Sequence, residues 1–287
     1  MSVDLVVLQT LNGLTFGALL FLLASGFTLV YGLMRIVNLA HGALYLVGGY
    51  VAVAVMAMTE SFPLAVLAGI VSAAVIGLGI DRLLLRRVAG QELPEVLLTV
   101  GIALVIGDLC LALFGGKPQL LPVPSELSGA TSLGPFTYPT YRLFIMAVGV
   151  LVGVGLYLGL NRTRLGAQVR AGVDDREMTA AVGIRVDRLF AILFVVGSGL
   201  AGLAGAIAAG LLTMRPAADT DILLYALVVV IVGGLGSVPG AAVGSIVIGL
   251  ADAYSRTWLP ELSTFAVFAP MAIILVLRPR GLMGRTT

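Results

Sequence analysis

The sequence predicts an all-α, polytopic membrane protein, a bundle of transmembrane helices with about nine crossings. Composition is the first reason: 59% of the 287 residues are hydrophobic and 11% are charged, whereas soluble domains carry about 25% charged residues. The second reason is that the apolar residues form long runs separated by short polar segments. We therefore expect the helices to lie in lipid rather than around a soluble core.

The individual spans follow from the length of these runs, because a crossing helix needs about twenty apolar residues. Clear spans are predicted at residues 8–33, 63–81, 95–114, 140–160 and 188–211. Shorter or Gly/Pro-interrupted spans are predicted at residues 40–58, 222–235, 238–256 and 263–277. The pattern allows roughly eight to ten crossings, and we expect residues 1–287 to form a single transmembrane domain.

Basic residues predict the orientation, because short loops rich in Lys and Arg stay on the cytoplasmic side. Arginines cluster at residues 82–87, in the 161–188 loop and in the tail at 278–287. The N-terminus is therefore expected outside and the C-terminus in the cytoplasm, with 115–139 as an extracytoplasmic loop. The N-terminus has no basic region typical of a signal peptide, so the first apolar run is expected to be a retained span.

Single residues exclude several chemistries. One cysteine, Cys110, cannot form an internal disulfide, and one histidine, His41, cannot build a multi-histidine metal site. The only lysine, Lys117, precedes Pro118, so the GxxxxGK[ST] loop of ATPases is absent. No catalytic site, metal or cofactor is expected, and no basic stripe suits nucleic acid. Uphill transport by this chain would need an ion gradient or another subunit.

Two glycine-rich segments interrupt apolar runs, NLAHGALYLVGGY at 38–50 and VGGLGSVPGAAVGS at 232–245. Irregular backbone at membrane depth is tolerated only inside protein or beside water. One interpretation is therefore a pair of broken or re-entrant helices that help to form a solute pathway. The other interpretation is simpler. The segment at 38–50 would be a tight hairpin in which Asn38 caps the next helix, and the segment at 232–245 would be a turn between two short spans. A proton-carrying role for His41 lacks acidic partners nearby in the sequence.

Two acidic residues lie inside apolar runs, where carboxylates are costly and often functional. Asp252 is four residues from Arg256, so the two are expected to pair on one helix. Asp108, in VIGDLCLALF, has no charged neighbour in its run. It is the residue that an ion-coupled secondary transporter would use.

The 161–188 loop is the most charge-rich interruption of the chain, with six arginines and four acids. The stretch RAGVDDREMTAAVGI predicts one helix with Arg170, Asp174 or Asp175, Met178 and Ala181 along one face. The two acids are expected near a helix start, which the helix dipole favours, and Gly183 fits a C-terminal stop. The segment is either a docking surface for a soluble partner or a solvated connector.

Over residues 9–284 the chain resembles the LivH-like permease subunits of branched-chain amino acid ABC importers. The resemblance is carried by four segments in family order: LNGLTFGALLFLLASGFTLVYGLMRIVNLAHGALYLVGGY, RLGAQVRAGVDDREMTAAVGIRVDRLFAILFVVGSGLAGLAG, GGLGSVPGAAVGSIVIG and RPRGLMG. It implies a membrane permease subunit for branched-chain or related amino acids, in the cytoplasmic (inner) membrane of a bacterium.

The resemblance also implies partners and site residues. The expected partners are two cytoplasmic ATP-binding subunits, a second permease subunit (a LivM-like paralogue or a second copy) and an extracytoplasmic solute-binding protein. Residues 161–188 become the cytoplasmic coupling loop. The residues implied for the substrate pathway or gate are Asn12, Asn38, His41, Gly42, Gly234, Gly236 and Pro239. Those implied for ATPase coupling are Arg164, Gly166, Arg170, Ala171, Asp175, Ala180 and Gly183.

Other functions stay open on the sequence alone. The same type of complex carries urea, short amides or other small carboxylates in similar permeases. An ion-coupled secondary transporter using Asp108, a passive channel and a non-transporting membrane scaffold are the alternatives of other classes.

Overall fold

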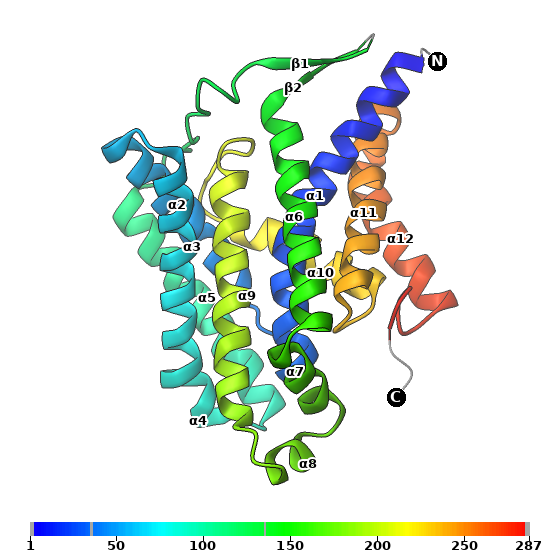
Figure 1. Cartoon of the computed structure of the whole chain (residues 1–287). Helices are drawn as coiled ribbons and strands as arrows, with labels where there is room; N and C mark the ends of the chain where they lie inside the picture. Colours follow the sequence, from blue (N-terminus) through cyan, green and yellow to red (C-terminus); the bar gives the residue numbers. More distant parts are fainter. Residues whose placement is uncertain (1–2, 35–36, 135, 285–287) are drawn as a thin grey trace.

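A computed structural model describes residues 3–34, 37–134 and 136–284, and these residues form an almost entirely helical bundle (Figure 1). Eight of the described helical segments are long and apolar enough to cross a membrane, which agrees with the expected polytopic all-α fold. The long helices are α1 (Val3–Met34), α2 (His41–Thr59), α3 (Phe62–Gly79), α5 (Glu92–Phe114), α6 (Thr140–Arg162), α9 (Val186–Ala208), α11 (Val238–Trp258) and α12 (Ser263–Leu277).

Shorter elements connect these helices. They are a π-helical segment (Ile80–Leu85), α4 (Arg86–Val88), α7 (Arg164–Asp174), α8 (Arg176–Ala181), α10 (Ala218–Gly233) and a 3₁₀ turn (Pro260–Leu262). Strands β1 (Ala130–Leu133) and β2 (Phe136–Pro139) form an antiparallel hairpin inside the 115–139 segment.

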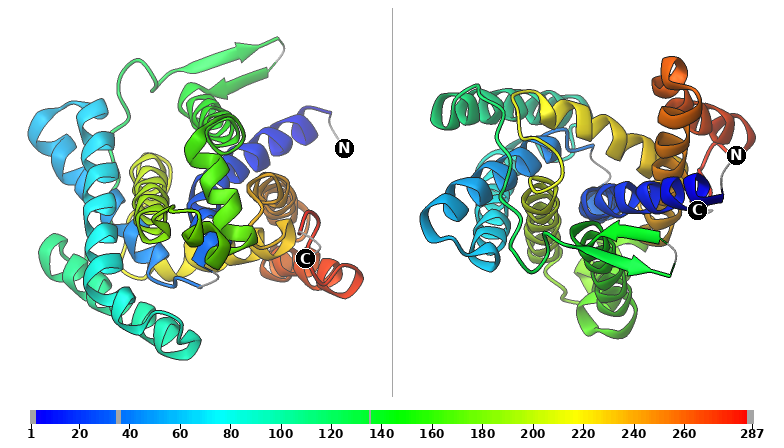
Figure 2. Two further views of the ribbon diagram at one scale, coloured as in Figure 1. Left: turned by 60° about the horizontal axis from the view of Figure 1, so that its bottom comes forward. Right: turned by 90° about the horizontal axis from the view of Figure 1, so that it is seen from above.

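Helix α10 is the ninth apolar segment that the sequence predicts, at residues 222–235. It has 16 residues, fewer than the roughly twenty that a full crossing needs. Figure 2 shows it running obliquely across the bundle rather than along the other helices. The expected ninth span is therefore a short helix that begins inside the bundle.

The two ends of the bundle differ in character. The N-terminus and the β1–β2 hairpin lie at one end in Figure 1, whereas α4, α7 and α8 lie at the other. The C-terminal segment belongs with the second end, because the Leu282 and Met283 amides donate to the carbonyls of Val232 and Gly233 at 2.8 and 2.9 Å. A Cβ built on nearby Gly236 would in turn meet the backbone of Gly32, close to the end of α1. The described parts of the three arginine-rich regions are thus gathered at one end of the molecule.

Helix α9 is the centre of the packing, with α1, α2 and α3 around it (Figure 2). A Cβ added at Gly202 of α9 would lie against the Gly69 carbonyl of α3, and one at Gly48 of α2 would lie against the backbone of Gly202. Glycine permits this approach because it has no side chain, and close backbone packing is what holds helices together where lipid supplies no hydrophobic drive. Three helices therefore meet at three glycines.

The outer helices show the opposite pattern. Leu104 of α5, Leu151 of α6 and Val276 of α12 are 66%, 72% and 83% exposed. Large exposed apolar side chains are ordinary on a surface that faces lipid or another membrane subunit. The apolar surface of this chain is thus displayed outward while its small residues form the interior.

We predict that Gly202→Val destabilises the fold strongly. The added methyl groups would meet the backbone of α3 rather than flexible side chains, and overpacking of this kind costs about 1–3 kcal/mol or more. The unfolding temperature of the purified protein in detergent should fall by roughly 5–10 °C. Gly101→Val on α5 is the matched control, because nothing lies within 4 Å of its Cβ position. Equal melting of the two variants would contradict the packing described here.

Candidate functional site

The chain turns back into the bundle after α1, and α2 starts at depth. His41, the first residue of α2, is fully buried, and its Nε2 lies 3.0 Å from the Leu23 carbonyl of α1. Its ring also packs edge-on against Phe27. Leu23 is eleven residues before the end of α1, so His41 lies about 16 Å inside that end. The connection before α2 is re-entrant in the sense that it returns into the bundle before the helix begins.

Asn38 shapes this connection without capping α2. The N-cap position is Ala40, and no side chain caps the helix. Instead Asn38 Oδ1 accepts a hydrogen bond from the Ala40 amide at 3.1 Å, while the Leu39 amide donates to Thr99 Oγ1 of α5 at 3.2 Å. The expectation that Asn38 caps the helix is therefore wrong, because its side chain closes a tight turn one residue earlier. Among the described residues, Asn38 Nδ2 and His41 Nδ1 are buried without a hydrogen-bond partner.

The start of α2 meets the start of α10. A Cβ on Gly42 would press on the Asp219 carbonyl and the Leu223 side chain, so glycine is needed for the two helix starts to touch. The chain reaches this point through residues 209–217, which pair with the 115–121 segment: Gln119 and Met214 exchange hydrogen bonds at 2.8 and 2.7 Å. This second re-entrant connection is absent from the expectations above, and Gly210 and Pro216 are the only local signals for it.

A pocket of about 550 Å³, with charged and apolar side chains in its lining, opens beside the first turns of α10. Arg215 and Asp221 form an ion pair at 2.5 Å. Arg256 Nε donates to Asp252 Oδ2 at 2.7 Å, as the four-residue spacing predicts, and Tyr225 Oη donates to Asp252 Oδ1 at 3.2 Å. The remaining lining residues are Phe16, Tyr45, Leu212, Thr213, Ala218, Ile222, Leu224, Thr264 and Phe268.

This pocket lies near the middle of the bundle. Tyr225 packs edge-on against Phe16, with ring centroids 5.4 Å apart, and Phe16 is close to the midpoint of the 32-residue α1. The side chains of Arg215 and Asp221 are nevertheless 55% and 57% exposed. A charge at the bilayer centre costs about 2.5–3.5 kcal/mol on insertion scales. The exposed Arg215 and Asp221 side chains pair with each other, so the mouth of the pocket carries both signs of charge on the surface of this chain.

Asn12 is placed apart from the other predicted pathway residues. Its side-chain oxygen accepts hydrogen bonds from Tyr138 Oη, at 3.1 Å, and from Arg142. These partners lie on β2 and at the start of α6, so Asn12 ties α1 to the hairpin end of the molecule.

Gly234, Gly236 and Pro239 lie in the turn between α10 and α11 or at the start of α11, not inside one broken helix. Gly234 and Gly236 have φ of +105° and +78°, a region that side-chain-bearing residues rarely adopt. Ser237 Oγ caps α11 by accepting from the Gly240 amide at 3.1 Å. This turn and Arg170 of α7 line one cavity of about 280 Å³. The predicted gate segment is thus brought against the predicted coupling segment.

Helix α7 is fastened to the end of α6. Thr163 caps it, since its Oγ1 accepts from the Gly166 amide at 3.0 Å. Gly166 is required because a Cβ there would collide with the Leu160 carbonyl, and Arg170 donates to the same carbonyl from the next turn of α7. Arg164 and Ala171, in contrast, are exposed.

The predicted coupling segment is two helices rather than the single helix expected from its pattern. Asp174 ends α7, and Asp175 is extended (φ −150°) with its Oδ1 accepting from the Met178 amide at 2.9 Å as the cap of α8. An N-cap cannot itself be helical, which breaks the predicted face at this residue. Gly183 has φ +87° just after α8, so its prediction as a helix stop is confirmed.

The far side of α8 is an exposed apolar patch. Met178 and Val182 are 62% and 69% exposed, and Ala180 is exposed between them. Behind the segment a small hydrophobic cluster joins α6, α7 and α9; it comprises Val169, Val186, Leu189, Phe190 and Leu193, with Leu160, Val173 and Ile184 at its edge. This cluster packs α7 against α6 and α9, and α8 is joined to it through the Asp175 cap and the Ile184 amide, which donates to the Thr179 carbonyl at 3.3 Å.

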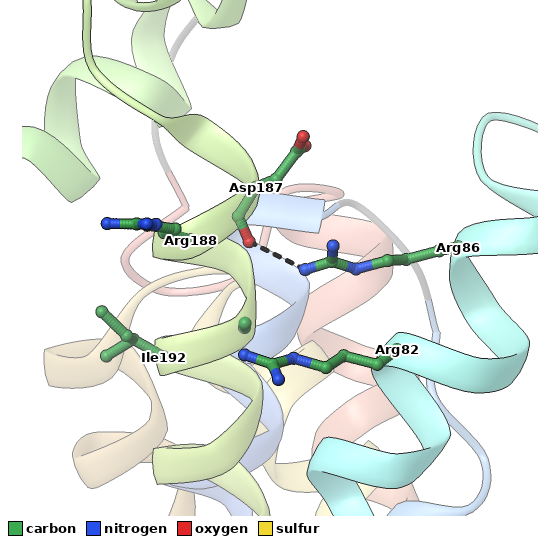
Figure 3. A pocket seen from close by; sticks show the side chains of 6 residues that line it. Arg82, Arg86, Asp187, Arg188 and Ile192 are labelled. Carbon is green, nitrogen blue, oxygen red and sulfur yellow. Dashed lines mark hydrogen bonds between the residues drawn. The ribbon is translucent and has the colours of Figure 1, made fainter.

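Arginines surround the same end of the molecule. Figure 3 shows Arg82 and Arg86 reaching toward α9, with Arg188 and Ile192 on α9 itself. Arg86 Nη2 donates to the Asp187 carbonyl at 3.2 Å and pairs with Asp81 at 3.5 Å. These contacts join the π-helical end of α3 to the start of α9.

Asp108 is exposed on α5. It points out of this chain rather than into the bundle and lines none of the cavities described above. The described residues also hold no cluster of three metal-binding side chains.

The described residues thus form a bundle of long apolar helices, with connections that return to its centre and an exposed apolar patch at one end. Residues 9–277 match the family of branched-chain amino acid transport system permease components, and the chain belongs to this family. It is therefore a permease subunit and not an enzyme.

Named relatives agree along nearly the whole chain. The high-affinity branched-chain amino acid transport system permease proteins BraD of Pseudomonas aeruginosa and LivH of Escherichia coli are each 30% identical, over 96% of this chain and 95% of their own length. A probable branched-chain amino acid transport permease protein LivH of Methanocaldococcus jannaschii is 27% identical over 95% of this chain and 91% of its own length.

We predict that Gly234→Val loosens the C-terminal segment. A Cβ there would meet the Gly284 backbone, and valine is strained at φ +105°; such strain costs about 1–3 kcal/mol. Trypsin should cleave after Arg280 roughly tenfold faster, since about 1.4 kcal/mol changes an equilibrium tenfold. Gly159→Val, whose Cβ position is open, is the control. Unchanged cleavage in the first variant would contradict the contact.

Proposed function

We propose that this chain is the membrane permease subunit of an ABC importer for branched-chain or related amino acids. It would form one transmembrane permease domain in a bacterial inner membrane, with its N-terminus outside and its C-terminus in the cytoplasm. Two ATP-binding subunits would dock from the cytoplasm, a second permease subunit would complete the pathway, and a solute-binding protein would deliver the solute from outside. Family membership supports the complex type, and the printed names of the relatives support the solute class.

The observation that carries the proposal is the α7–α8 segment. It offers Met178 and Val182 at the arginine-rich end of the molecule, and α7, to which α8 is joined at Asp175, packs onto α6 and α9. A soluble ATPase could press on this patch because both contact surface and mechanical support are present. Arg170 and Gly166 would pass the movement to the end of α6 through the Leu160 carbonyl.

The same movement would reach the re-entrant region through the α10–α11 turn, which shares a cavity with Arg170. ATP binding would close the ATPase pair, shift α7–α8 as a unit and open the pathway to one side at a time. Rigid-body motion of this kind suits packed elements, which tend to switch between arrangements rather than deform continuously.

We predict that Asp175→Ala reduces coupling while Asp175→Asn preserves it. Alanine removes the α8 cap at a cost of about 1 kcal/mol, whereas asparagine is as good a cap as aspartate. ATP-driven uptake of L-leucine in proteoliposomes holding the full complex should fall several-fold for the first variant only. Membrane insertion, measured by yield of the assembled complex, should match in both. Uptake by Asp175→Ala equal to that of the parent complex would contradict the proposed coupling role of the α8 cap.

Uptake by the reconstituted complex also separates the remaining function classes. We expect L-leucine to accumulate inside vesicles whose lumen corresponds to the cytoplasm. This accumulation should require ATP in the lumen and the binding protein outside. Accumulation by this chain alone under a proton or sodium gradient would favour a secondary transporter, with Asp108 as the first residue to change. Equilibration of L-leucine without accumulation would indicate a channel. Absence of any leucine flux with all partners present would indicate a scaffold.

A further inference from the structure

The pocket beside α10 has the chemistry of a site for an amino acid in its zwitterionic form. We propose that Arg215 binds the α-carboxylate of the transported solute and Asp221 its α-ammonium group, while the apolar lining receives the side chain. This inference rests on the proposed transport function, and it names the residues of this chain that bind the solute in transit.

The polar half of the pocket presents both signs of charge at one place. Arg215 and Asp221 close an ion pair at 2.5 Å, and Arg256 lies on the same pocket wall, held by Asp252 and Tyr225. A zwitterion can insert into an ion pair because it offers each partner an opposite charge in exchange. Arginine suits the carboxylate, since its planar guanidinium can donate two parallel hydrogen bonds.

The apolar half is formed by aliphatic and aromatic side chains from three helices and from the re-entrant connection. Phe16 comes from α1, Ile222 and Leu224 from α10, Phe268 from α12 and Leu212 from residues 209–217. The volume of about 550 Å³ lies within the range of about 300–1,000 Å³ that small-molecule sites occupy. A branched aliphatic side chain fits this lining better than a polar one.

The position of the pocket favours a transit site over a surface ion pair. It lies beside α1 and the first turns of α10, and its exposed charges need water or protein around them in a membrane protein. Ala217, between Arg215 and Asp221, adopts φ +67°. Alanine in this left-handed region carries strain, and such strain is concentrated at functional sites.

The charges also distinguish between solute classes. Urea and short amides are neutral, so they would leave the separated Arg215 and Asp221 without opposite charges. A carboxylate without an ammonium group would satisfy Arg215 and leave Asp221 uncompensated. Only a solute with both charges replaces both halves of the ion pair, which is why the site points to a free amino acid.

The test uses the full complex in proteoliposomes with L-leucine, the binding protein and ATP. Arg215→Gln and Asp221→Asn should each lower uptake by about tenfold, the effect of losing one charge-assisted contact, while ATP hydrolysis and complex assembly persist. The matched controls are Arg87→Gln and Glu126→Gln, exposed charges outside the pocket, which should transport as the parent does.

A charge-swapped variant, Arg215→Asp with Asp221→Arg, separates recognition from a structural role. The swap restores an ion pair but exchanges the two charges, so uptake should stay low if the pair orients the solute. Recovery of uptake in the swapped variant, or normal uptake in both single variants, would overturn the proposal. If the parent complex itself shows no ATP-driven leucine uptake, the proposed function fails instead, and the inference falls with it.

A second measurement applies if the charge variants do not assemble. Thr213→Cys places a thiol on the pocket wall in a Cys110→Ala background, leaving both charges in place. Leucine, delivered by the binding protein, should slow modification of this thiol by a small charged thiol reagent several-fold. An unchanged rate under turnover conditions would overturn the proposal.

Discussion

Backbone-to-backbone contact at glycines is the constraint on which the rest of this structure depends. Lipid offers helices no hydrophobic reason to associate, so dispersion between closely fitted surfaces must hold them. Gly48, Gly69 and Gly202 bring α2, α3 and α9 to such contact, and Gly26 and Gly197 do the same for α1 and α9. The re-entrant connection before α2 is held by this framework, because His41 binds a backbone carbonyl of α1 and packs beside Gly26.

Helix α10 is the element that joins the two regions for which we propose functions, the pocket at Arg215 and Asp221 and the α7–α8 segment. Its first turns carry Asp221 and Tyr225 in that pocket, and its last residue, Gly233, leads into the turn that faces Arg170. A 16-residue helix is about 24 Å long, so it links the middle of the bundle to the arginine-rich end as one rigid piece. A displacement at α7–α8 therefore has a short physical path to the pocket. The Asp221 and Arg215 pair lies at the end of that path.

The spans were predictable from the sequence to within a few residues: 95–114 is Glu92–Phe114 and 140–160 is Thr140–Arg162. Such segments can be read from length and hydropathy because the thickness of the bilayer sets how many apolar residues a crossing helix needs. Depth was not predictable. Residues 209–217 have ordinary turn composition, and the start of α10 inside the bundle depends on Gly42 making room for Asp219. The break at Asp175 was missed because either of two adjacent aspartates fits a helix start, and only the extended backbone of the second makes it the cap.

Electron cryo-microscopy of the complete complex in a lipid nanodisc would test the account most directly. We expect an ATPase subunit seated on Met178 of α8 and on Val182, the residue that follows α8. We also expect the pocket of Arg215 and Asp221 to open toward the second permease subunit or a water-filled path. A complex in which α8 is bare of protein and the α10 pocket is covered by lipid chains would contradict both the coupling route and the placement of the pathway.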